Sequence, residues 1–215
     1  MVGRDGFNAA GVAVCGNLLR SVHDGRKPGV PVPIIRRRVL DSARLDEALG
    51  AVWHADRAAS TNYLVAHDSG VIINLEASPE QVYPLYPERG LLTHSNHFLA
   101  LAAQVQGIGI AGPDSLYRHR RARDLLEPKL GGITVEDVQQ ALRDHVGFPR
   151  SVCRHPDDGA DDPTMSIASI VMDLGARTMY VASGPPCCHE YQAVRLPNEH
   201  KEGAPHARHA SLAAH

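Results

Sequence analysis

The 215-residue sequence lacks a long apolar run. No stretch approaches the roughly 20 apolar residues that a helix needs to cross a bilayer, and no apolar segment behind a basic N-terminus marks a secretory signal peptide. The formal net charge is only -2, whereas general attraction to nucleic acid or to an anionic membrane needs a basic face or tail. We therefore expect a soluble, cytoplasmic protein that has neither nucleic acid nor a membrane as its partner.

Cysteine is also scarce, with four residues in the chain. Cys187 and Cys188 are adjacent, an arrangement too constrained to form an ordinary disulfide framework with Cys15 and Cys153. The small number of cysteines and their spacing fit a protein of a reducing compartment. Because the sequence contains no Cys-x-x-Cys pair, we expect the Cys187-Cys188-His189 segment to be a structural loop rather than a redox or metal motif.

Neither isolated cysteine carries the signals of a nucleophile. Cys15 ends the apolar run that begins at Val12, where a thiol is usually a small, inert core residue. Cys153 precedes Arg154, and a cationic neighbour is one feature of reactive thiols, but no paired base is visible beside it, so structural burial is favoured. Ser95 lacks the Gly-x-Ser-x-Gly turn that exposes a serine nucleophile.

The composition is that of an ordinary globular protein, with 43% hydrophobic and 21% charged residues. A length of 215 residues suits one sizeable domain. We expect a single domain over residues 1–198 and a disordered tail over residues 199–215. The tail contains four histidines, and we expect no designed metal site there because a disordered segment fixes no ligand geometry. These histidines are His200, His206, His209 and His215.

The β-leaning runs are short and separated by turn signals. The clearest is a hairpin in which residues 63–67 and 71–76 flank Asp68-Ser69-Gly70. Residues 83–87 contain two prolines, which predicts an edge strand or an irregular connection. The remaining predicted strands cover residues 12–15, 166–173, 179–182 and 190–196.

Helical spacing of apolar residues predicts two helices after the first strand and two more before the last strands. Asp41 or Ser42 is the expected N-cap of the second helix, and Thr134 that of the fourth. Strands and helices thus come in segregated runs with hairpins, which indicates an α+β fold with antiparallel sheets. The predicted helices cover residues 34–40, 45–53, 114–130 and 134–146.

Two arginine runs fall within these predicted helices, at residues 36–38 and between Arg118 and Arg123. We interpret both as solvated helix faces, as is usual on the mixed-charge surface of soluble domains. The alternative is that they bind an anionic substrate.

The segment Leu-Leu-Thr-His-Ser-Asn-His-Phe at residues 91–98 is the best candidate for an active-site wall. Each of its polar groups must find a partner if buried, or cost about 1–3 kcal/mol. A rigid amide at Asn96 could donate to an oxyanion and stabilise a tetrahedral intermediate. The alternative is an asparagine that only caps a turn.

His94 and His97 are three residues apart. On a strand that spacing points the two side chains to opposite faces, and no third ligand follows at a recognisable spacing. We therefore expect no metal here, with one histidine packed and the other hydrogen-bonded. A zinc hydrolase that uses His94, His97 and His189 is the alternative, and it would reveal itself by bound zinc.

Four segments, taken in order, carry a family resemblance. Residues 6–14, 94–97, 115–125 and 151–154, which include the Gly-Phe-Asn-Ala-Ala-Gly, His-Ser-Asn-His and Ser-Val-Cys-Arg runs, resemble the acyl-coenzyme A:6-aminopenicillanic-acid acyltransferase family. The likeness extends over about residues 3–196. It implies an N-terminal-nucleophile hydrolase, whose fold is an αββα sandwich.

The resemblance also implies a chemistry. Members mature by self-cleavage before a cysteine, whose thiol then attacks while its own α-amino group serves as base. They cleave or transfer acyl groups at amides and thioesters, without a cofactor. The family's oxyanion asparagine falls on Asn96, and His94, Ser95 and His97 become candidate binding residues beside it. The implied partner is a small-molecule acyl donor or an amide substrate.

The family's nucleophilic cysteine has no counterpart here, because Cys15 lies past the matching position. Asp161-Asp162-Pro163-Thr164 also occupies the region of a family serine and arginine. We therefore expect an inactive C-terminal portion of such an enzyme that lacks its first strands and self-associates through exposed strand edges. The alternative is a non-catalytic ligand-binding relative without a nucleophile.

Overall fold

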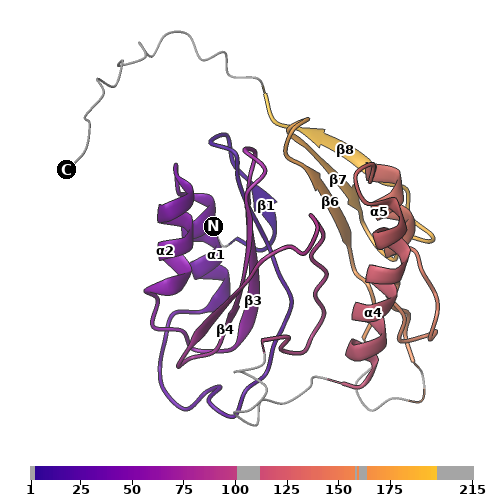
Figure 1. The fold of residues 1–215 in the computed structure, drawn as a ribbon. Coiled ribbons are helices and arrows are strands. Elements are labelled where there is room, and N and C mark those ends of the chain that lie inside the picture. Colours follow the sequence, from indigo (N-terminus) through magenta and orange to yellow (C-terminus); the bar gives the residue numbers. More distant parts are fainter. Residues whose placement is uncertain (1–2, 101–111, 158, 160–163, 198–215) are drawn as a thin grey trace.

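The structure is a computed structural model that describes residues 3–100, 112–157, 159 and 164–197. Within it the chain forms four layers. A layer of helices covers the first sheet, a second sheet faces the first, and a second layer of helices covers the outer side of the second sheet (Figure 1). The predicted αββα sandwich with antiparallel sheets is therefore confirmed. The predicted tail, residues 199–215, lies outside the described residues.

The first sheet has five strands in sequence order, and every neighbouring pair is antiparallel. Its central hairpin is the one that the sequence predicts, with Gly70 in the left-handed region at φ 88°. The prolyl strand lies at the sheet edge, where a missing N–H is tolerated. The strands are β1 (Gly6–Phe7), β2 (Val12–Cys15), β3 (Thr61–His67), β4 (Ile72–Ala77) and β5 (Val82–Leu85).

The second sheet has three antiparallel strands, and all three overlap the predicted ones. They are β6 (Ser169–Asp173), β7 (Thr178–Ala182) and β8 (Gln192–Arg195). The helices are α1 (Val32–Leu40), α2 (Leu45–Trp53), α4 (Asp114–Leu126) and α5 (Val135–Leu142), with a 3-10 turn at Glu127–Lys129. No helix in the described part of the chain combines the length and apolarity that a bilayer crossing requires.

The helix boundaries correct some predictions. Neither Asp41 nor Ser42 caps the second helix, because Asp41 closes α1 and α2 begins after Arg44, which makes no side-chain cap bond. Thr134 does cap α5, in a reciprocal capping box with Asp137. The helix ends at Leu142, four residues before the predicted end, and the chain then turns toward a loop described below.

The core lies between the first sheet and its helices. Because side chains alternate along a strand, Val12 and Val14 of β2 and Val65 of β3 point to the helix side. Their helical partners lie four residues apart on each helix, which places them on one face. These partners are Ile35 and Val39 of α1, and Ala48 and Val52 of α2. All are fully buried, so the first sheet is anchored on its outer side.

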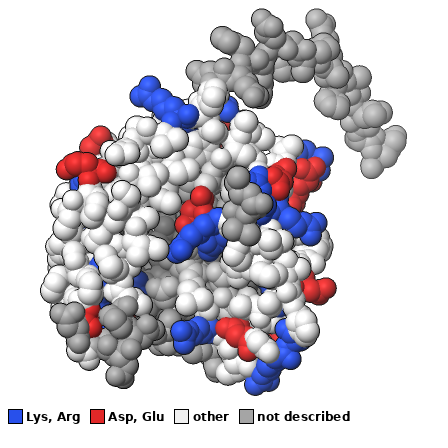
Figure 2. Space-filling model, turned by 180° about the vertical axis from the view of Figure 1, so that it is seen from behind, with Lys and Arg blue, Asp and Glu red and all other residues white. Residues whose placement is uncertain are grey.

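The charged surface is mixed. Figure 2 shows Lys and Arg side chains interspersed with Asp and Glu on the face opposite to the view of Figure 1. On α4, Arg120 pairs with Asp124 at 2.8 Å while both stay largely exposed, as expected of a solvated helix face. Arg36 corrects that interpretation for the first arginine run, because its side chain is buried and reaches Asp5 at 3.4 Å.

Candidate functional site

A cavity of about 860 Å³ separates the two sheets. Its wall on the first sheet is made by the β2 and β3 side chains that face away from the helices, including Ala13, Leu64 and Ala66. The second sheet contributes Ile170 and Met172 of β6. These small and medium apolar side chains leave an open, apolar cavity between the two sheets. Its volume is typical of small-molecule sites.

Polar groups line both ends of the cavity. Asp5 and Asn17 lie near Cys15 at one end, and His67 and Asp68 lie beside the start of β2 at the other. Asn17 is held by its backbone carbonyl, which accepts hydrogen bonds from the Asn62 amide N–H at 2.9 Å and from the Thr61 hydroxyl at 2.9 Å. Sequence analysis missed Asn17, although a Gly-Asn pair directly after an apolar strand is the same kind of signal that drew attention to residues 91–98.

The Cys15 thiol is unsuited to attack a carbonyl. Burial, reinforced by the nearby Asp5 carboxylate, raises the pKa of Cys15 to about 12. Burial also raises the pKa of Asp5 against the opposing pull of Arg36. The thiol is therefore protonated near neutral pH, and a thiol rather than a thiolate is a poor nucleophile. The structure places Cys15 on the cavity wall, partly exposed, rather than in the core that the sequence suggested.

The polar segment at residues 91–98 lies outside the strands, several residues after β5 ends at Leu85. Leu91 makes one isolated bridge to Glu88, and the following residues run in irregular backbone. Contacts to α4 and β4 hold this loop in place. Ser95 and His97 are buried, while His94 and Asn96 are partly buried.

Asn96 is held from both sides of its amide. Its Nδ2 donates to the Leu18 carbonyl at 3.0 Å, and its Oδ1 accepts from Arg118 at 2.9 Å. Its backbone N–H donates to the Ser115 hydroxyl at 2.7 Å. An amide nitrogen carries two hydrogens, so one N–H remains beyond the bond to Leu18. Asn96 does not itself line the cavity, but Leu18 is the neighbour of Asn17, which does.

Arg118 connects this loop to a buried carboxylate. Its guanidinium donates to the Ser95 hydroxyl at 2.7 Å and to Asp114 at 2.8 Å and 2.9 Å. Arg154 donates to the same Asp114 oxygen at 2.8 Å. Burial disfavours the charged carboxyl, but these hydrogen bonds outweigh it and lower the pKa of Asp114. Arg118 is thus a structural clamp on the loop, which corrects its interpretation as a solvated residue.

The two histidines of the segment contact different partners. His94 Nε2 lies 2.8 Å from a Glu76 carboxylate oxygen, and His97 Nδ1 lies 2.7 Å from the Ser115 hydroxyl. Both therefore hydrogen-bond, rather than one of them only packing. His189 lies elsewhere, with its Nδ1 3.1 Å from the Pro185 carbonyl. The structure does not bring His94, His97 and His189 together as a metal site.

The lowered pKa of His97 makes the stability of the fold depend on pH. Burial, with further contributions from His119 and His94, lowers the pKa of His97 to about 4. The unfolded chain then binds the extra proton more readily, so His97 favours the folded state above the ordinary histidine pKa of about 6.5, and this contribution is lost as pH falls toward 4. We expect about 2–3 kcal/mol of the wild-type unfolding free energy to disappear over that window.

Urea denaturation at a series of pH values checks this. His97→Gln should flatten the profile between pH 6.5 and 4, whereas His54→Gln, at an exposed position after α2, should keep the wild-type slope. Equal slopes in the wild type and His97→Gln would contradict the assignment.

Comparison with known proteins identifies the class of protein that this sandwich and its central cavity define. Residues 1–187 match the family described as acyl-coenzyme A:6-aminopenicillanic acid acyl-transferase. The chain belongs to this family, as its motifs suggest.

Among its relatives is the acyl-coenzyme A:6-aminopenicillanic-acid-acyltransferase 40 kDa form of Emericella nidulans, which is 29% identical over 188 residues. The match covers 86% of this chain and 51% of that protein. The chain thus spans about half the length of this curated relative.

Solved structures show the fold. A variant of conjugated bile acid hydrolase from Clostridium perfringens superposes with a TM-score of 0.56 and 12% identity, covering 90% of this chain and 77% of that chain. Penicillin V acylase from Agrobacterium tumefaciens gives a TM-score of 0.54 and 18% identity, covering 85% and 63%. At these identities the likeness establishes the shared sandwich alone.

Proposed function

We propose that this chain forms the acyl-binding part of an enzyme that cleaves or transfers acyl groups at amide or thioester bonds. The observation that carries the proposal is the 860 Å³ cavity between the sheets, with apolar walls and polar groups at both ends. An acyl chain needs an apolar chamber, and its carbonyl needs a few placed hydrogen-bond donors at the mouth. Family membership supports the same chemistry.

In this proposal the apolar walls receive the acyl group. Ala13 and Ala66 leave room on the first sheet, and Ile170 closes the opposite side. Asn96 supplies the oxyanion contact through the amide N–H that Leu18 does not use. Removing one such donor typically costs about 10²–10³ in rate. Its neighbours His94, Ser95 and His97 then act by fixing the loop, since their polar atoms contact Glu76, Arg118 and Ser115.

The purified 215-residue chain should bind acyl compounds without turning them over. Cys15 is the thiol at the cavity, and burial keeps it protonated. This observation also favours the second candidate function, a ligand-binding relative that performs no chemistry.

Ligand titration tests the proposal. Isothermal titration with penicillin V, a conjugated bile acid and an acyl-coenzyme A should give saturable binding of at least one of them. Ala66→Phe places a ring in the cavity and should weaken that binding tenfold or more. Ala193→Phe, on the exposed face of β8, is the matched control and should bind like the wild type.

Mass spectrometry of the same mixtures tests whether this chain turns the compounds over. Any hydrolysis or acyl transfer would contradict the expected inactivity and the second candidate function, and its loss in Cys15→Ser would also contradict the view that the Cys15 thiol does not attack. Absence of binding to all three compounds would contradict both candidates.

A further inference from the structure

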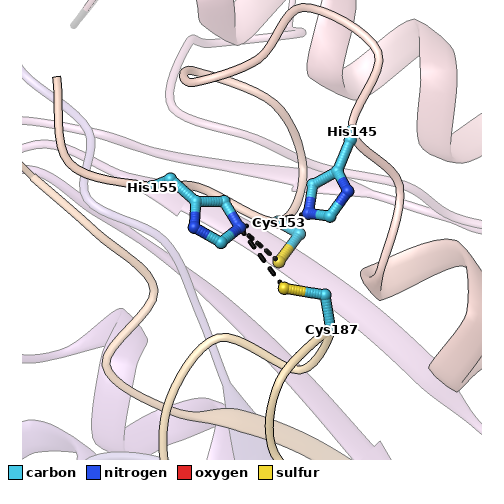
Figure 3. Close-up of side chains that lie close together, drawn as sticks. All are labelled: His145, Cys153, His155 and Cys187. Carbon is cyan, nitrogen blue, oxygen red and sulfur yellow. Dashed lines mark hydrogen bonds between the residues drawn. The ribbon is translucent and has the colours of Figure 1, made fainter.

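Four metal-binding side chains meet at one place and are not among the residues that line the cavity. They are His145, Cys153, His155 and Cys187, and their ligand atoms all lie within 4.8 Å of one another. Figure 3 shows the two thiols and two imidazoles pointing toward a common centre. They come from the loop after α5 and from the turn between β7 and β8.

The local fold explains why the first three ligands converge. The backbone N–H of Cys153 donates to the Asp144 carbonyl at 3.0 Å, and that of His155 donates to the Pro149 carbonyl at 2.9 Å. These bonds fold the loop back on itself and bring His145 beside His155, with their Nε2 atoms 3.1 Å apart. Backbone hydrogen bonds within the loop therefore hold His145, Cys153 and His155 close together.

A separate contact brings in the fourth ligand. Arg143, at the C-terminal end of α5, donates through Nε to the Pro186 carbonyl at 2.9 Å. Cys187 follows directly, and its Sγ lies 3.4 Å from His155 Nε2. Cys153 Sγ lies 3.6 Å from the same nitrogen.

These separations are those of a tetrahedral zinc site. With Zn–N near 2.0–2.1 Å and Zn–S near 2.3 Å, tetrahedral angles place two nitrogen ligands about 3.3 Å apart and a nitrogen and a sulfur about 3.6 Å apart. The observed N–N distance of 3.1 Å and the S–N distances of 3.4 Å and 3.6 Å agree within 0.2 Å. The other ligand pairs lie within 4.8 Å of one another, so binding one ion would draw the ligands together by up to about 1 Å.

We propose that His145, Cys153, His155 and Cys187 bind one Zn²⁺ ion as a closed Cys2His2 site. Two thiolates and two imidazoles form the donor set that zinc favours, and the two thiolate charges offset that of the ion. Four protein ligands leave no open position, so the site is structural. It would fasten the loop after α5 to the β7–β8 turn.

The proposal departs from the sequence analysis, which expects no metal and assigns the vicinal cysteines to a structural loop. Cys153 is buried, whereas His145 and Cys187 are exposed, so an ion has a route of entry. Cys188 is exposed and does not belong to the cluster, although its Sγ contacts that of Cys187 at 3.2 Å. This pair of neighbouring cysteines offers a matched test.

Zinc content is the first measurement. The full chain, purified without an affinity tag and dialysed into metal-free buffer, should retain one zinc per molecule by inductively coupled plasma mass spectrometry. Cys187→Ser should lose it, and Cys188→Ser should keep it. A chain in which all four tail histidines are changed to glutamine should also keep it. Zinc-free wild type that fails to take up added zinc, or equal loss from both cysteine variants, would overturn the site.

Cobalt substitution tests the donor set independently of zinc yield. Co²⁺ added to the zinc-free chain should give tetrahedral d–d absorption and a sulfur-to-metal charge-transfer band. Cys187→Ser should weaken the charge-transfer band, and Cys153→Ser should do the same if its circular dichroism shows that it folds. Octahedral absorption without a charge-transfer band in the wild type would contradict thiolate ligation.

Chelation should reveal the structural role. Stripping the ion should lower the Tm of the wild type by about 5 °C or more, and added zinc should restore it. The Tm of Cys187→Ser should not respond to chelator. A wild-type Tm that is unchanged by chelator would contradict the proposed fastening of the two segments.

Discussion

Glu76→Ala is expected to lower the free energy of unfolding by about 4 kcal/mol or more. Glu76 is fully buried on β4, and its carboxylate accepts from His94 at 2.8 Å and from the backbone N–H groups of Leu99 and Ala100 at 2.5 Å and 2.9 Å. Each buried donor left without its acceptor costs about 1–3 kcal/mol. The loop that carries Asn96 lies between these contacts, so it should loosen first.

Urea denaturation followed by circular dichroism measures the loss. Glu76→Gln keeps one acceptor oxygen and should lose less than Glu76→Ala, which keeps the test informative if the alanine variant does not fold. Glu80→Gln is the matched control, because Glu80 is half exposed and pairs with Lys27 at 3.6 Å, a surface pair worth about 1 kcal/mol at most. A loss for Glu76→Ala no larger than that of the control would show that its three contacts do not hold the loop.

Local signals were enough to predict most of the elements and the α+β class, whereas the αββα arrangement was implied by the family resemblance. Strand β2, the β3–β4 hairpin and the N-cap at Thr134 depend on residues close in sequence, and each is confirmed. Alternation along β2 and β3 also fixes which side chains meet the helices. Even the error at α2 is local, since Asp41 and Ser42 are good capping residues whose position is used to end α1 instead.

The surroundings of Asn96 could not be predicted in the same way. Its loop depends on Glu76 from β4 and on Ser115 and Arg118 from α4, and no short-range pattern links these to residues 91–98. A glutamate inside an apolar strand run was nevertheless a usable signal. A buried carboxylate must be paired, so the position of Glu76 in an apolar run indicates a polar contact, although it does not identify the partner.

The proposed zinc ligands could not be predicted from short-range patterns either, because Cys187 lies still farther from the others in the sequence. Cys153 and Cys187 are 34 residues apart in sequence, and no Cys-x-x-Cys spacing joins them. Arg143 joins their two segments through its bond to the Pro186 carbonyl and its contact with the Tyr191 ring. Spacing rules for zinc sites describe ligands carried on one hairpin or one helix, so a site assembled by tertiary contacts escapes them.

Asp114→Ala should be the second severe change, with an expected loss of about 3–5 kcal/mol in unfolding free energy. The Asp114 carboxylate is buried and holds both Arg118 and Arg154. Its removal leaves two partly buried guanidinium groups side by side without their counter-ion. Because the folded state lowers the pKa of Asp114, its contribution is complete above the ordinary carboxyl pKa of about 4 and fades only at lower pH. The deficit should therefore be full at pH 7.

Asp124→Ala is the matched control on the same helix. Asp124 pairs with Arg120 at the same four-residue spacing, but in an exposed position, so its loss should cost about 0.5 kcal/mol or less. Ligand binding gives a second measure. Arg118 holds the Asn96 amide at 2.9 Å, so Asp114→Ala, at a temperature where it stays folded, should weaken acyl binding more than Asp124→Ala does. If the two variants lose equal stability, the Asp114 cluster contributes no more than a surface ion pair, and the rigidity of Asn96 must come from Leu18 and Ser115 alone.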